Sequence, residues 1–217
     1  AASAGAASAG AASAGAAVPV EGSVGAGAGA TAGRLKGGVG TASTVLATGH
    51  TVGAVVAANP MGEVIDPDTG LPWVPAVAAD LGLVAPDPAE VAAAATATPP
   101  VASRLNTTIG VVATDAALTR AQCRRLAMVA HDGLARAVRP AHSMFDGDTV
   151  FALATGTAAA GPVAPPELNA LCAAAAEAFA TAVVRGVLAA TSVGGVPAYR
   201  DRYPSALPSR VSARTDT

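Results

Sequence analysis

The stretch NTTIGVVATDA, residues 106–116, is the clearest strand signal in the sequence, and a threonine pair stands where the strand begins. A helix signal follows, because Thr119 and Gln122 have the spacing of a capping box. Apolar residues spaced by four then form one stripe: Leu126, Ala130, Leu134 and Val138. The segment therefore predicts a strand followed by a helix that packs on a sheet and ends at Pro140.

Strands and helices alternate along the rest of the chain. DTVFALAT, residues 148–155, predicts another strand, and Pro165-Pro166 begins an Ala-rich helix that runs to about residue 190, before a loop-like tail. Upstream, residues 44–58 predict two short strands around a Gly49-His50 turn. This alternation predicts an α/β fold whose small-residue helices pack closely on a sheet.

The remaining segments have the composition of loops. Residues 1–20 open with three AASAG repeats and predict an Ala/Gly/Ser-rich helix or a tail. Residues 59–75 half-resemble a calcium loop, but Val77 stands where that loop needs its bidentate glutamate. Residues 76–106 are rich in Ala and Pro and predict an exposed linker. We expect one folded domain overall.

Composition and charge exclude several classes of protein. Only 13% of the residues are charged and the net charge is −2, which argues against a nucleic-acid partner. Gly, Thr, Asn and Pro interrupt the Ala/Val stretches, so we expect no membrane partner. The unpaired spacing of Cys123 and Cys172 predicts buried thiols in a reducing compartment, and hence a cytoplasmic protein. Five arginines predict a solvated helix face or an oligomer contact: Arg120, Arg124, Arg125, Arg136 and Arg139.

No cofactor or metal ion is expected. The Gly-rich run from Gly22 to Gly40 imitates a dinucleotide fingerprint, but no acidic residue lies between Glu21 and Glu63 to bind a ribose. The GxSxG and HExxH motifs are also missing from the sequence. For the three histidines a structural role is favoured: His50, His131 and His142.

The Asn106-Thr107 pair is a candidate nucleophile site, because it joins a linker to an apolar strand. If the bond between them were cut, Thr107 would carry a hydroxyl together with an α-amine of pKa about 8, which can act as the base for that hydroxyl. Taken alone, the tripeptide NTT is also typical of a simple turn.

Three further features are candidates for the same chemistry. In FDGDT, Asp146 and Asp148 can point the same way across the Gly147 turn and hold an ammonium or hydroxyl in place. Lys36 is the single lysine of the chain and lies among glycines. The side-chain amide of Asn59 can donate to an oxyanion or, equally, cap the turn at Pro60.

Five stretches together resemble one family: GSVGAGAGATAGRLKGGVGTAS, AANPMGEV, NTTIGVVATDA, AHDGLARAVRP and FDGDTVFALATG. From about Glu21 to Tyr203 the chain is similar to the L-aminopeptidase/D-esterase (DmpA-like) family. The threonine and the DGD motif are nearest to its nylon-oligomer (6-aminohexanoate oligomer) endo-hydrolase branch, since the aminopeptidase branch has a serine nucleophile and a Ser/Glu pattern.

The resemblance implies an αββα sandwich of the DmpA/ornithine-acetyltransferase type and a precursor that cuts itself between Asn106 and Thr107. Residues 21–106 would then end the α subunit and residues 107–217 would form the β subunit, in a tetramer of cleaved pairs. The family also has a region ahead of the Gly-rich run, so we expect part of the fold to be missing from this sequence.

The same resemblance implies the roles of the candidate residues. Thr107 matches the N-terminal nucleophile, Asp146 and Asp148 the acidic pair that supports it, Asn59 the oxyanion-side amide, and Lys36 the lysine near the nucleophile. The expected function is amide hydrolysis in peptides or nylon oligomers. The alternatives are an aminopeptidase or D-amino-acid esterase, an acyltransferase of the same fold, and a non-enzymatic assembly domain in which NTT and DGD are turns.

Overall fold

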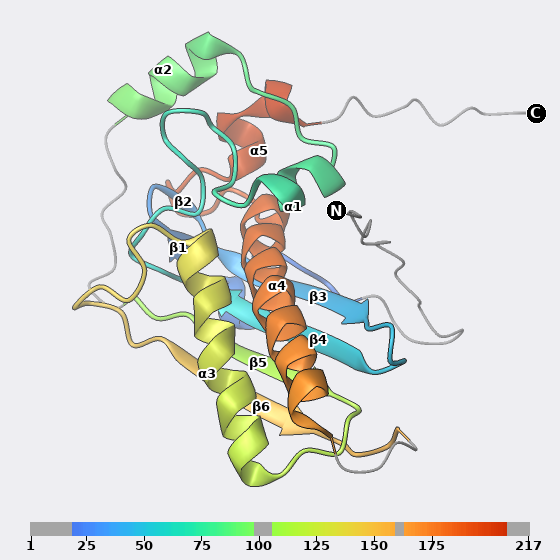
Figure 1. Ribbon diagram of the computed structural model, residues 1–217. Coiled ribbons are helices and arrows are strands. Elements are labelled where there is room, and N and C mark those ends of the chain that lie inside the picture. The colour runs from blue at the N-terminus through green and yellow to red at the C-terminus, as the bar shows by residue number, and fades with distance from the viewer. Residues whose placement is uncertain (1–18, 98–105, 159–162, 208–217) are drawn as a thin grey trace, which may run out of the picture.

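A four-stranded sheet forms one layer of the molecule, and two long helices form the other (Figure 1). The computed structural model describes residues 19–97, 106–158 and 163–207. The strands lie in the order β3 (Gly38–Val45), β4 (Thr51–Ala58), β5 (Ile109–Thr114) and β6 (Thr149–Ala154). The pairs β3–β4 and β4–β5 are antiparallel, whereas β5 and β6 are parallel and are joined across the helical layer.

The two long helices are α3 (Arg120–Ala137) and α4 (Pro165–Ala189). The predicted capping box is confirmed, because the Thr119 side chain accepts from the backbone of Gln122 and the Gln122 side chain accepts from the backbone of Thr119. The predicted apolar stripe of α3 is also confirmed as buried. The predictions for β5, β6 and α4 agree with the structure, and β3 starts earlier than predicted, inside the Gly-rich run.

Glycines let the helical layer approach the backbone of its neighbours. A Cβ at Gly40 would lie 2.0 Å from the carbonyl oxygen of Ala182 in α4, and one at Gly133 would lie 2.1 Å from that of Ala176. Neither distance is possible for a real side chain. The Gly-rich run is therefore a packing surface for α4.

Helix α4 is a core helix that also has the length and composition of a membrane span. Its 25 residues include a window of mean hydropathy 1.6, so the expectation that no apolar stretch is long enough for a span is wrong for this segment. However, 72% of that window is buried inside the structure. Its apolar character is thus accounted for by packing on the sheet and on α3.

Short elements gather at one end of the molecule, beyond the ends of α3 and α4 (Figure 1). They are β1 (Thr31–Ala32), β2 (Leu35–Lys36), α1 (Pro75–Asp80), α2 (Pro88–Thr96), α5 (Tyr199–Arg202) and the 3-10 turns Gly25–Gly27 and Pro204–Ala206. The prediction of an exposed linker over 76–106 is wrong up to Thr96, because Val77, Ala78 and Ala94 are buried.

The predicted loop-like tail is also wrong in part. Tyr199 of α5 is fully buried, and its hydroxyl donates to the Gly70 carbonyl oxygen at 3.0 Å. Of the two cysteines, Cys172 is buried as expected, whereas Cys123 is only half-buried. Residues 1–18 and 98–105, for which a tail and a linker were expected, lie outside the described residues.

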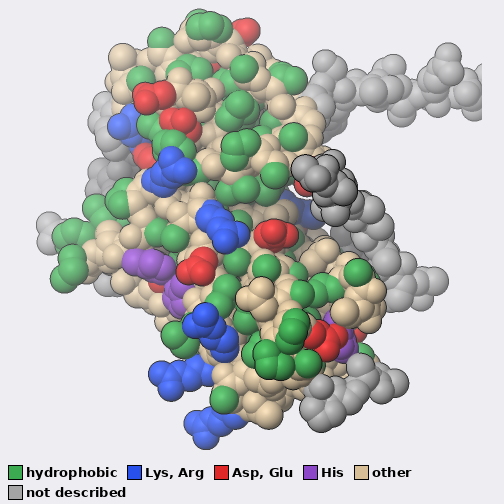
Figure 2. All heavy atoms as spheres, in the orientation of Figure 1, with side chains coloured by type: hydrophobic (Ala, Val, Ile, Leu, Met, Phe, Trp, Pro, Cys, Tyr) green, Lys and Arg blue, Asp and Glu red, His purple; other side chains and the backbone are tan. Residues whose placement is uncertain are grey.

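The outer surface of the helical layer carries charged side chains of both signs (Figure 2). All five arginines of the predicted cluster are exposed, as expected for a solvated face. Arg139 differs from the others, since its guanidinium lies 4.3 Å from the centre of the Trp73 ring.

The opposite face of the sheet is apolar and is not covered by the described residues. Its side chains are between 38% and 57% exposed, and we call them the open sheet face: Val55, Ile109, Val111, Phe151 and Leu153. Val55, Val111 and Phe151 stand opposite one another across β4, β5 and β6, so these side chains form a continuous apolar surface.

Candidate active site

Three strand ends bring the candidate residues to one edge of the sheet. Parallel neighbours begin at the same edge; Asp148 directly precedes β6, and Thr107 lies two residues before β5. Strand β4 runs the opposite way, so Asn59, which directly follows it, lies at the same edge. Asn59 and Asp148, which are 89 positions apart in the sequence, thus lie at the same edge because of the sheet topology.

The peptide bond between Asn106 and Thr107 is held on both sides. Asn106 is buried and pairs with Asp146 in a parallel bridge, through which the Gly147 N–H donates to the Asn106 carbonyl oxygen at 3.1 Å. On the other side, the Thr107 N–H donates to the Asn59 carbonyl oxygen at 2.9 Å. The Thr107 hydroxyl lies 2.5 Å from the Asn106 carbonyl oxygen. The hydroxyl and the carbonyl of one candidate cleavage site are therefore in contact.

Gly147 leaves room for that hydroxyl. A Cβ at position 147 would lie 2.9 Å from the Thr107 Oγ1, which is closer than real Cβ contacts. The glycine of the DGD motif thus separates two carboxylates and keeps the space around Thr107 open.

Asp146 fixes the loop in which it lies. One carboxylate oxygen accepts from the Met61 N–H at 3.0 Å. The other accepts from the N–H of Ser143 at 2.9 Å and from its hydroxyl at 2.6 Å. This carboxylate therefore ties the segment after β4 to the segment before β6, directly beside the Asn106 bridge.

The Asp148 side chain is buried, with 4% of its surface exposed. One oxygen accepts from the Thr108 N–H at 2.8 Å, and the other lies 2.8 Å from the Nδ1 of His142. In the uncut chain, backbone N–H groups donate to oxygens of both carboxylates, because strand starts and turns leave such donors without ladder partners. Of these donors, the Thr108 N–H directly follows Thr107. That the aspartates hold the amine and hydroxyl of Thr107 stays a prediction, since this amine forms only after cleavage.

Asn59 and Lys36 are linked through β1. The Asn59 Oδ1 accepts from the Thr31 N–H at 2.9 Å, which sets the orientation of its amide. Thr31 pairs with Lys36 across the β1–β2 hairpin. Lys36 is 2% exposed, its Nζ donates to the Ala28 carbonyl oxygen at 2.9 Å, and burial lowers the pKa of its ammonium. Asn59 is thus hydrogen-bonded to Thr31, and Thr31 is the strand partner of Lys36.

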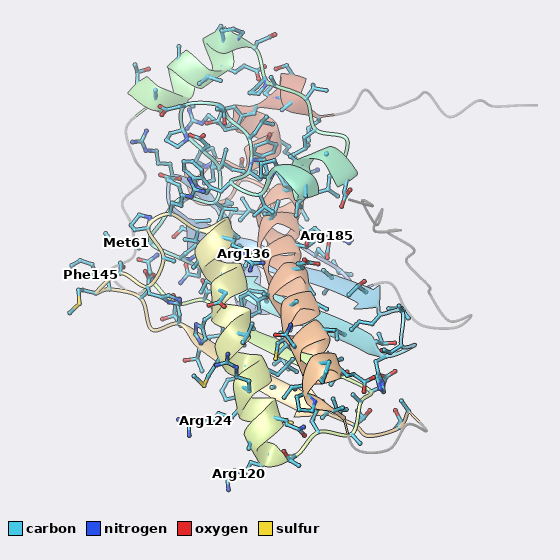
Figure 3. The ribbon with its side chains drawn as sticks, viewed as in Figure 1. Met61, Arg120, Arg124, Arg136, Phe145 and Arg185 are labelled. Atoms are coloured by element: carbon cyan, nitrogen blue, oxygen red, sulfur yellow. The ribbon has the colours of Figure 1, made fainter. Side chains whose placement is uncertain are left out.

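Apolar side chains flank the site. Strand alternation places Thr107 on the same face as Ile109 and Val111, which is the open sheet face. Met61 and Phe145 are 46% and 65% exposed and project from the same side of the molecule (Figure 3). Apolar side chains therefore lie on the same sheet face as Thr107.

Three residues make contacts with the candidate residues that were not predicted: His142, Ser143 and Gly147. Their signal was their position in PAHSMFDGD, within six residues of Asp148. The ring centroid of His142 lies 5.1 Å from that of His131. Burial and the neighbouring His142 both lower the pKa of His131.

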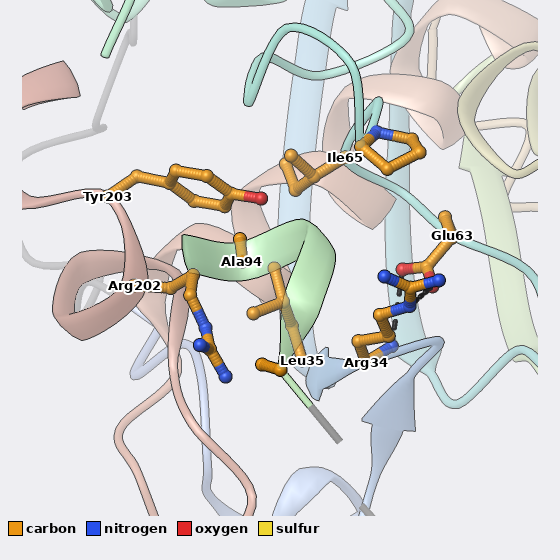
Figure 4. A pocket seen from close by; sticks show the side chains of 9 residues that line it. Arg34, Leu35, Glu63, Ile65, Ala94, Arg202 and Tyr203 are labelled. Carbon is orange, nitrogen blue, oxygen red and sulfur yellow. Dashed lines mark hydrogen bonds and ion pairs between the residues drawn. The ribbon is translucent and has the colours of Figure 1, made fainter. Parts of the chain in front are cut away.

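A separate pocket lies among the short elements and includes none of the candidate residues (Figure 4). In it, the Arg34 guanidinium pairs with the Glu63 carboxylate at 3.5 Å. Burial raises the pKa of Glu63, against the opposite effects of the Arg34 N–H and charge. Among the described residues, no group of three or more His, Cys, Asp or Glu side chains is arranged to hold a metal ion.

Comparison with known proteins gives consistent matches. The sequence profile of Peptidase family S58 matches residues 1–200. An uncharacterized aminopeptidase of Mycobacterium bovis is 51% identical over 200 residues, which are 87% of this chain and 58% of that protein. An uncharacterized aminopeptidase of Mycobacterium leprae is 55% identical over 194 residues, 85% of this chain and 53% of that protein. The chain thus spans just over half the length of these relatives.

Solved structures match at 31% identity. A β-aminopeptidase of a Burkholderia species aligns with a TM-score of 0.61, over 83% of this chain and 50% of its own. The L-aminopeptidase D-Ala-esterase/amidase of Ochrobactrum anthropi, described as a variant of the Ntn hydrolase fold, also aligns with a TM-score of 0.61, over 85% of this chain and 48% of its own. The predicted α/β fold class is therefore confirmed.

Proposed function

Because this chain belongs to peptidase family S58, we propose that it carries the nucleophile of a self-processing amide hydrolase, and that the nucleophile is Thr107. The observation that supports this most directly is the contact between the Thr107 hydroxyl and the Asn106 carbonyl, in a peptide bound on both sides. A simple turn has no need for such a contact at the start of a strand.

In the proposed self-cleavage, the Thr107 oxygen attacks the carbonyl carbon of Asn106. The bond from that carbon to the Thr107 nitrogen breaks, the nitrogen takes the hydroxyl proton, and an ester joins the two residues. Water then hydrolyses the ester, which leaves a carboxylate on Asn106 and restores the hydroxyl of Thr107. The Gly147 N–H donates to the oxygen that becomes negative in the first step.

Substrate hydrolysis uses the same oxygen with the new amine as its base. The amine accepts the hydroxyl proton while the oxygen attacks the substrate carbonyl, and the proton passes to the departing amine. Water then releases the acyl group. The Asn59 carbonyl, which accepts from the Thr107 N–H, is placed to orient that amine.

The other candidate residues support this chemistry without donating or accepting the transferred proton. Asp148 holds the backbone directly after Thr107, and Asp146 ties the segment after β4 to the loop before β6. The side-chain amide of Asn59 is proposed as an oxyanion donor, with its orientation set by Thr31. Lys36 adds positive charge behind Asn59.

The open sheet face supports an αββα arrangement, in which a second sheet packs against it. The nucleophile lies on that face, so the second sheet would complete the substrate pocket. We further propose that the two cleaved pieces stay together, that the cleaved pairs form a tetramer, and that the protein is cytoplasmic.

The proposed substrates are short peptides, since similar proteins are named as aminopeptidases. The threonine at position 107 with aspartates at 146 and 148 favours oligoamides such as 6-aminohexanoate oligomers as a second substrate class. An assay of both classes beside D-amino-acid esters, with acetyl transfer from acetylornithine to glutamate as a further reaction, separates the hydrolases from the acyltransferase.

Denaturing mass spectrometry of the purified protein tests the cleavage. We expect two pieces, the second with Thr107 at its N-terminus by Edman sequencing, and we expect Thr107→Ala to stay uncut and inactive. Thr107→Ser should cut slowly and keep some hydrolysis. Thr107→Cys should cut better than it hydrolyses amides, because its thiol fits poorly with an amine base placed for oxygen. Amide hydrolysis by an uncut Thr107→Ala protein would falsify the assignment, and a single uncut native chain without activity would favour the assembly domain.

A further inference from the structure

His142 makes one of the two described contacts of the buried Asp148 carboxylate, and nothing in the expected chemistry uses it. We propose that His142 is a positioning residue, whose imidazole holds Asp148 so that Asp148 fixes the backbone directly after the nucleophile. This inference rests on the proposed role of Thr107.

The carboxylate of Asp148 is buried. A carboxylate with 4% of its side chain exposed needs hydrogen bonds for both oxygens, because water reaches neither freely. The Thr108 N–H serves one oxygen, and the His142 Nδ1 serves the other at 2.8 Å. An ionised carboxylate only accepts, so the proton of this bond is on Nδ1. Removal of the imidazole would leave a buried oxygen without this donor.

The Asp148 carboxylate holds the backbone of Thr108. Thr108 directly follows the nucleophile, and Asp148 binds its N–H while the Thr149 N–H binds its carbonyl oxygen at 3.0 Å. Thr108 is fully buried. With its N–H held, the peptide that joins Thr107 to Thr108 has one orientation. A carboxylate free to rotate would release that peptide, and with it the direction of the Thr107 hydroxyl.

The backbone of His142 has a conformation that is rare for residues other than glycine. Its φ is +53°, and it is the single non-glycine residue with a positive φ among residues 19–97, 106–158 and 163–207. This conformation costs free energy for most side chains and persists where the surroundings require it. The ring of His131 in α3 packs against the imidazole from the other side, with an angle of 52° between the rings. The imidazole is thus held in place toward Asp148.

The positive φ of His142 determines which substitutions test the proposal. Glycine, asparagine and aspartate all tolerate a φ of +53° better than other residues do. His142→Asn keeps an N–H donor near Nδ1, His142→Gly removes the donor and relaxes the backbone, and His142→Asp places a like charge against Asp148. Asparagine and aspartate have nearly the same size, so that pair differs in donor capacity and charge alone.

We expect the turnover number and the rate of self-cleavage to fall in the order Asn, Gly, Asp. A hydrogen bond to a charged group corresponds to a factor of about 10 to 100, so His142→Gly should lose about that much in kcat with KM nearly unchanged. His142→Asn should stay within about one factor of ten of the native protein by the same reasoning. Met144→Asn is the control in the same loop and should keep the native kcat, because the Met144 side chain is 96% exposed.

A second measurement does not depend on activity. Hydrogen exchange of the Thr108 amide, followed by NMR, should be faster in His142→Gly and His142→Asp than in His142→Asn. If His142 only allows the chain to turn, the three variants should have equal kcat and equal exchange, because all three residues tolerate a positive φ. That result would overturn the proposal. If Thr107→Ala also shows that Thr107 is not the nucleophile, the exchange result still decides whether His142 holds Asp148.

Discussion

The Gly147 N–H donates a hydrogen bond of 3.1 Å to the carbonyl oxygen of Asn106, and the Thr107 hydroxyl lies 2.5 Å from the same oxygen. This carbonyl is the one that self-cleavage would attack. A backbone donor aimed at an oxygen that gains negative charge stabilises the intermediate without having to reorganise. The isolated bridge of Asn106 with Asp146, ahead of β5 and β6, therefore places a donor where the proposed self-cleavage needs one.

Substitution of Gly147 by alanine should slow self-cleavage. The new Cβ would lie 2.9 Å from the Thr107 Oγ1, so the hydroxyl must turn away from its position against the Asn106 carbonyl. We expect a loss of about 100-fold in the cleavage rate, comparable to the removal of one oxyanion donor. A time course of denaturing gels after translation measures this rate.

The control for that variant is Gly29→Ala. A Cβ at position 29 meets no atom within 4 Å, and its φ is not positive. The control protein should process like the native one. Equal cleavage rates in the two alanine variants would show that the space beside Thr107 has no role in processing.

Most of the fold follows from sequence patterns. The strands β4, β5 and β6 and the helices α3 and α4 were predictable, because each has a regular apolar period or a cap at its start. The helices α1 and α2 were not, since Ala-rich segments with prolines resemble an exposed linker until their buried contacts are known. The start of β3 was missed because glycine has a low strand propensity, and here it admits α4.

The candidate site was predictable in its members but not in its contacts. Thr107, Asp146, Asp148 and Asn59 lie at one edge of the sheet, as strand ends should. The sequence indicates nothing about which backbone N–H each carboxylate accepts from, because that depends on the register between β5 and β6. For the same reason His142 was assigned a structural role, and the bond of Lys36 to the Ala28 carbonyl was not predicted.

Phe151 tests whether the open sheet face is covered in the native protein. Its side chain is 57% exposed here and lies in β6. If another layer packs on this face, Phe151→Ser removes a buried aromatic ring and should lower the stability by about 3 kcal/mol. The control is Met144→Ser, since Met144 is 96% exposed. Equal melting temperatures for the two variants would mean that the face is solvated.

Glu63 should make a measurable contribution to the pH dependence of stability. Burial raises its pKa, so the folded state binds the proton more tightly than the unfolded state does. This group therefore favours folding most below its ordinary pKa of 4.5, and that contribution is lost as the pH rises through the raised value. In Glu63→Gln the loss is absent.

The melting temperature of Glu63→Gln relative to the native protein should therefore increase between pH 4.5 and pH 7. Differential scanning calorimetry across this range gives the difference directly. Asp80→Asn serves as a control at an exposed position. A difference that decreases with pH would mean that the pairing with Arg34 dominates over burial.

The two aspartates of the DGD motif should respond differently to the same substitution. In Asp148→Asn, the amide oxygen can still accept from Thr108, and the amide nitrogen can donate to His142 once the imidazole carries its proton on Nε2. In Asp146→Asn, one oxygen faces the Met61 N–H and the other faces the Ser143 N–H, so either orientation of the amide sets an NH₂ group against a backbone donor.

We therefore expect Asp146→Asn to lose about 1 kcal/mol or more of stability, the cost of one unsatisfied donor, and Asp148→Asn to lose less. Both should lose turnover well beyond that, because Asp148 holds the Thr108 N–H and Asp146 holds the loop from which the Gly147 N–H donates to the Asn106 carbonyl oxygen. Urea unfolding measures the stability and single-turnover hydrolysis measures the chemistry. If both variants melt early but keep full activity per folded molecule, the two aspartates are structural. If Asp148→Asn is the less stable variant, His142 cannot move its proton from one ring nitrogen to the other.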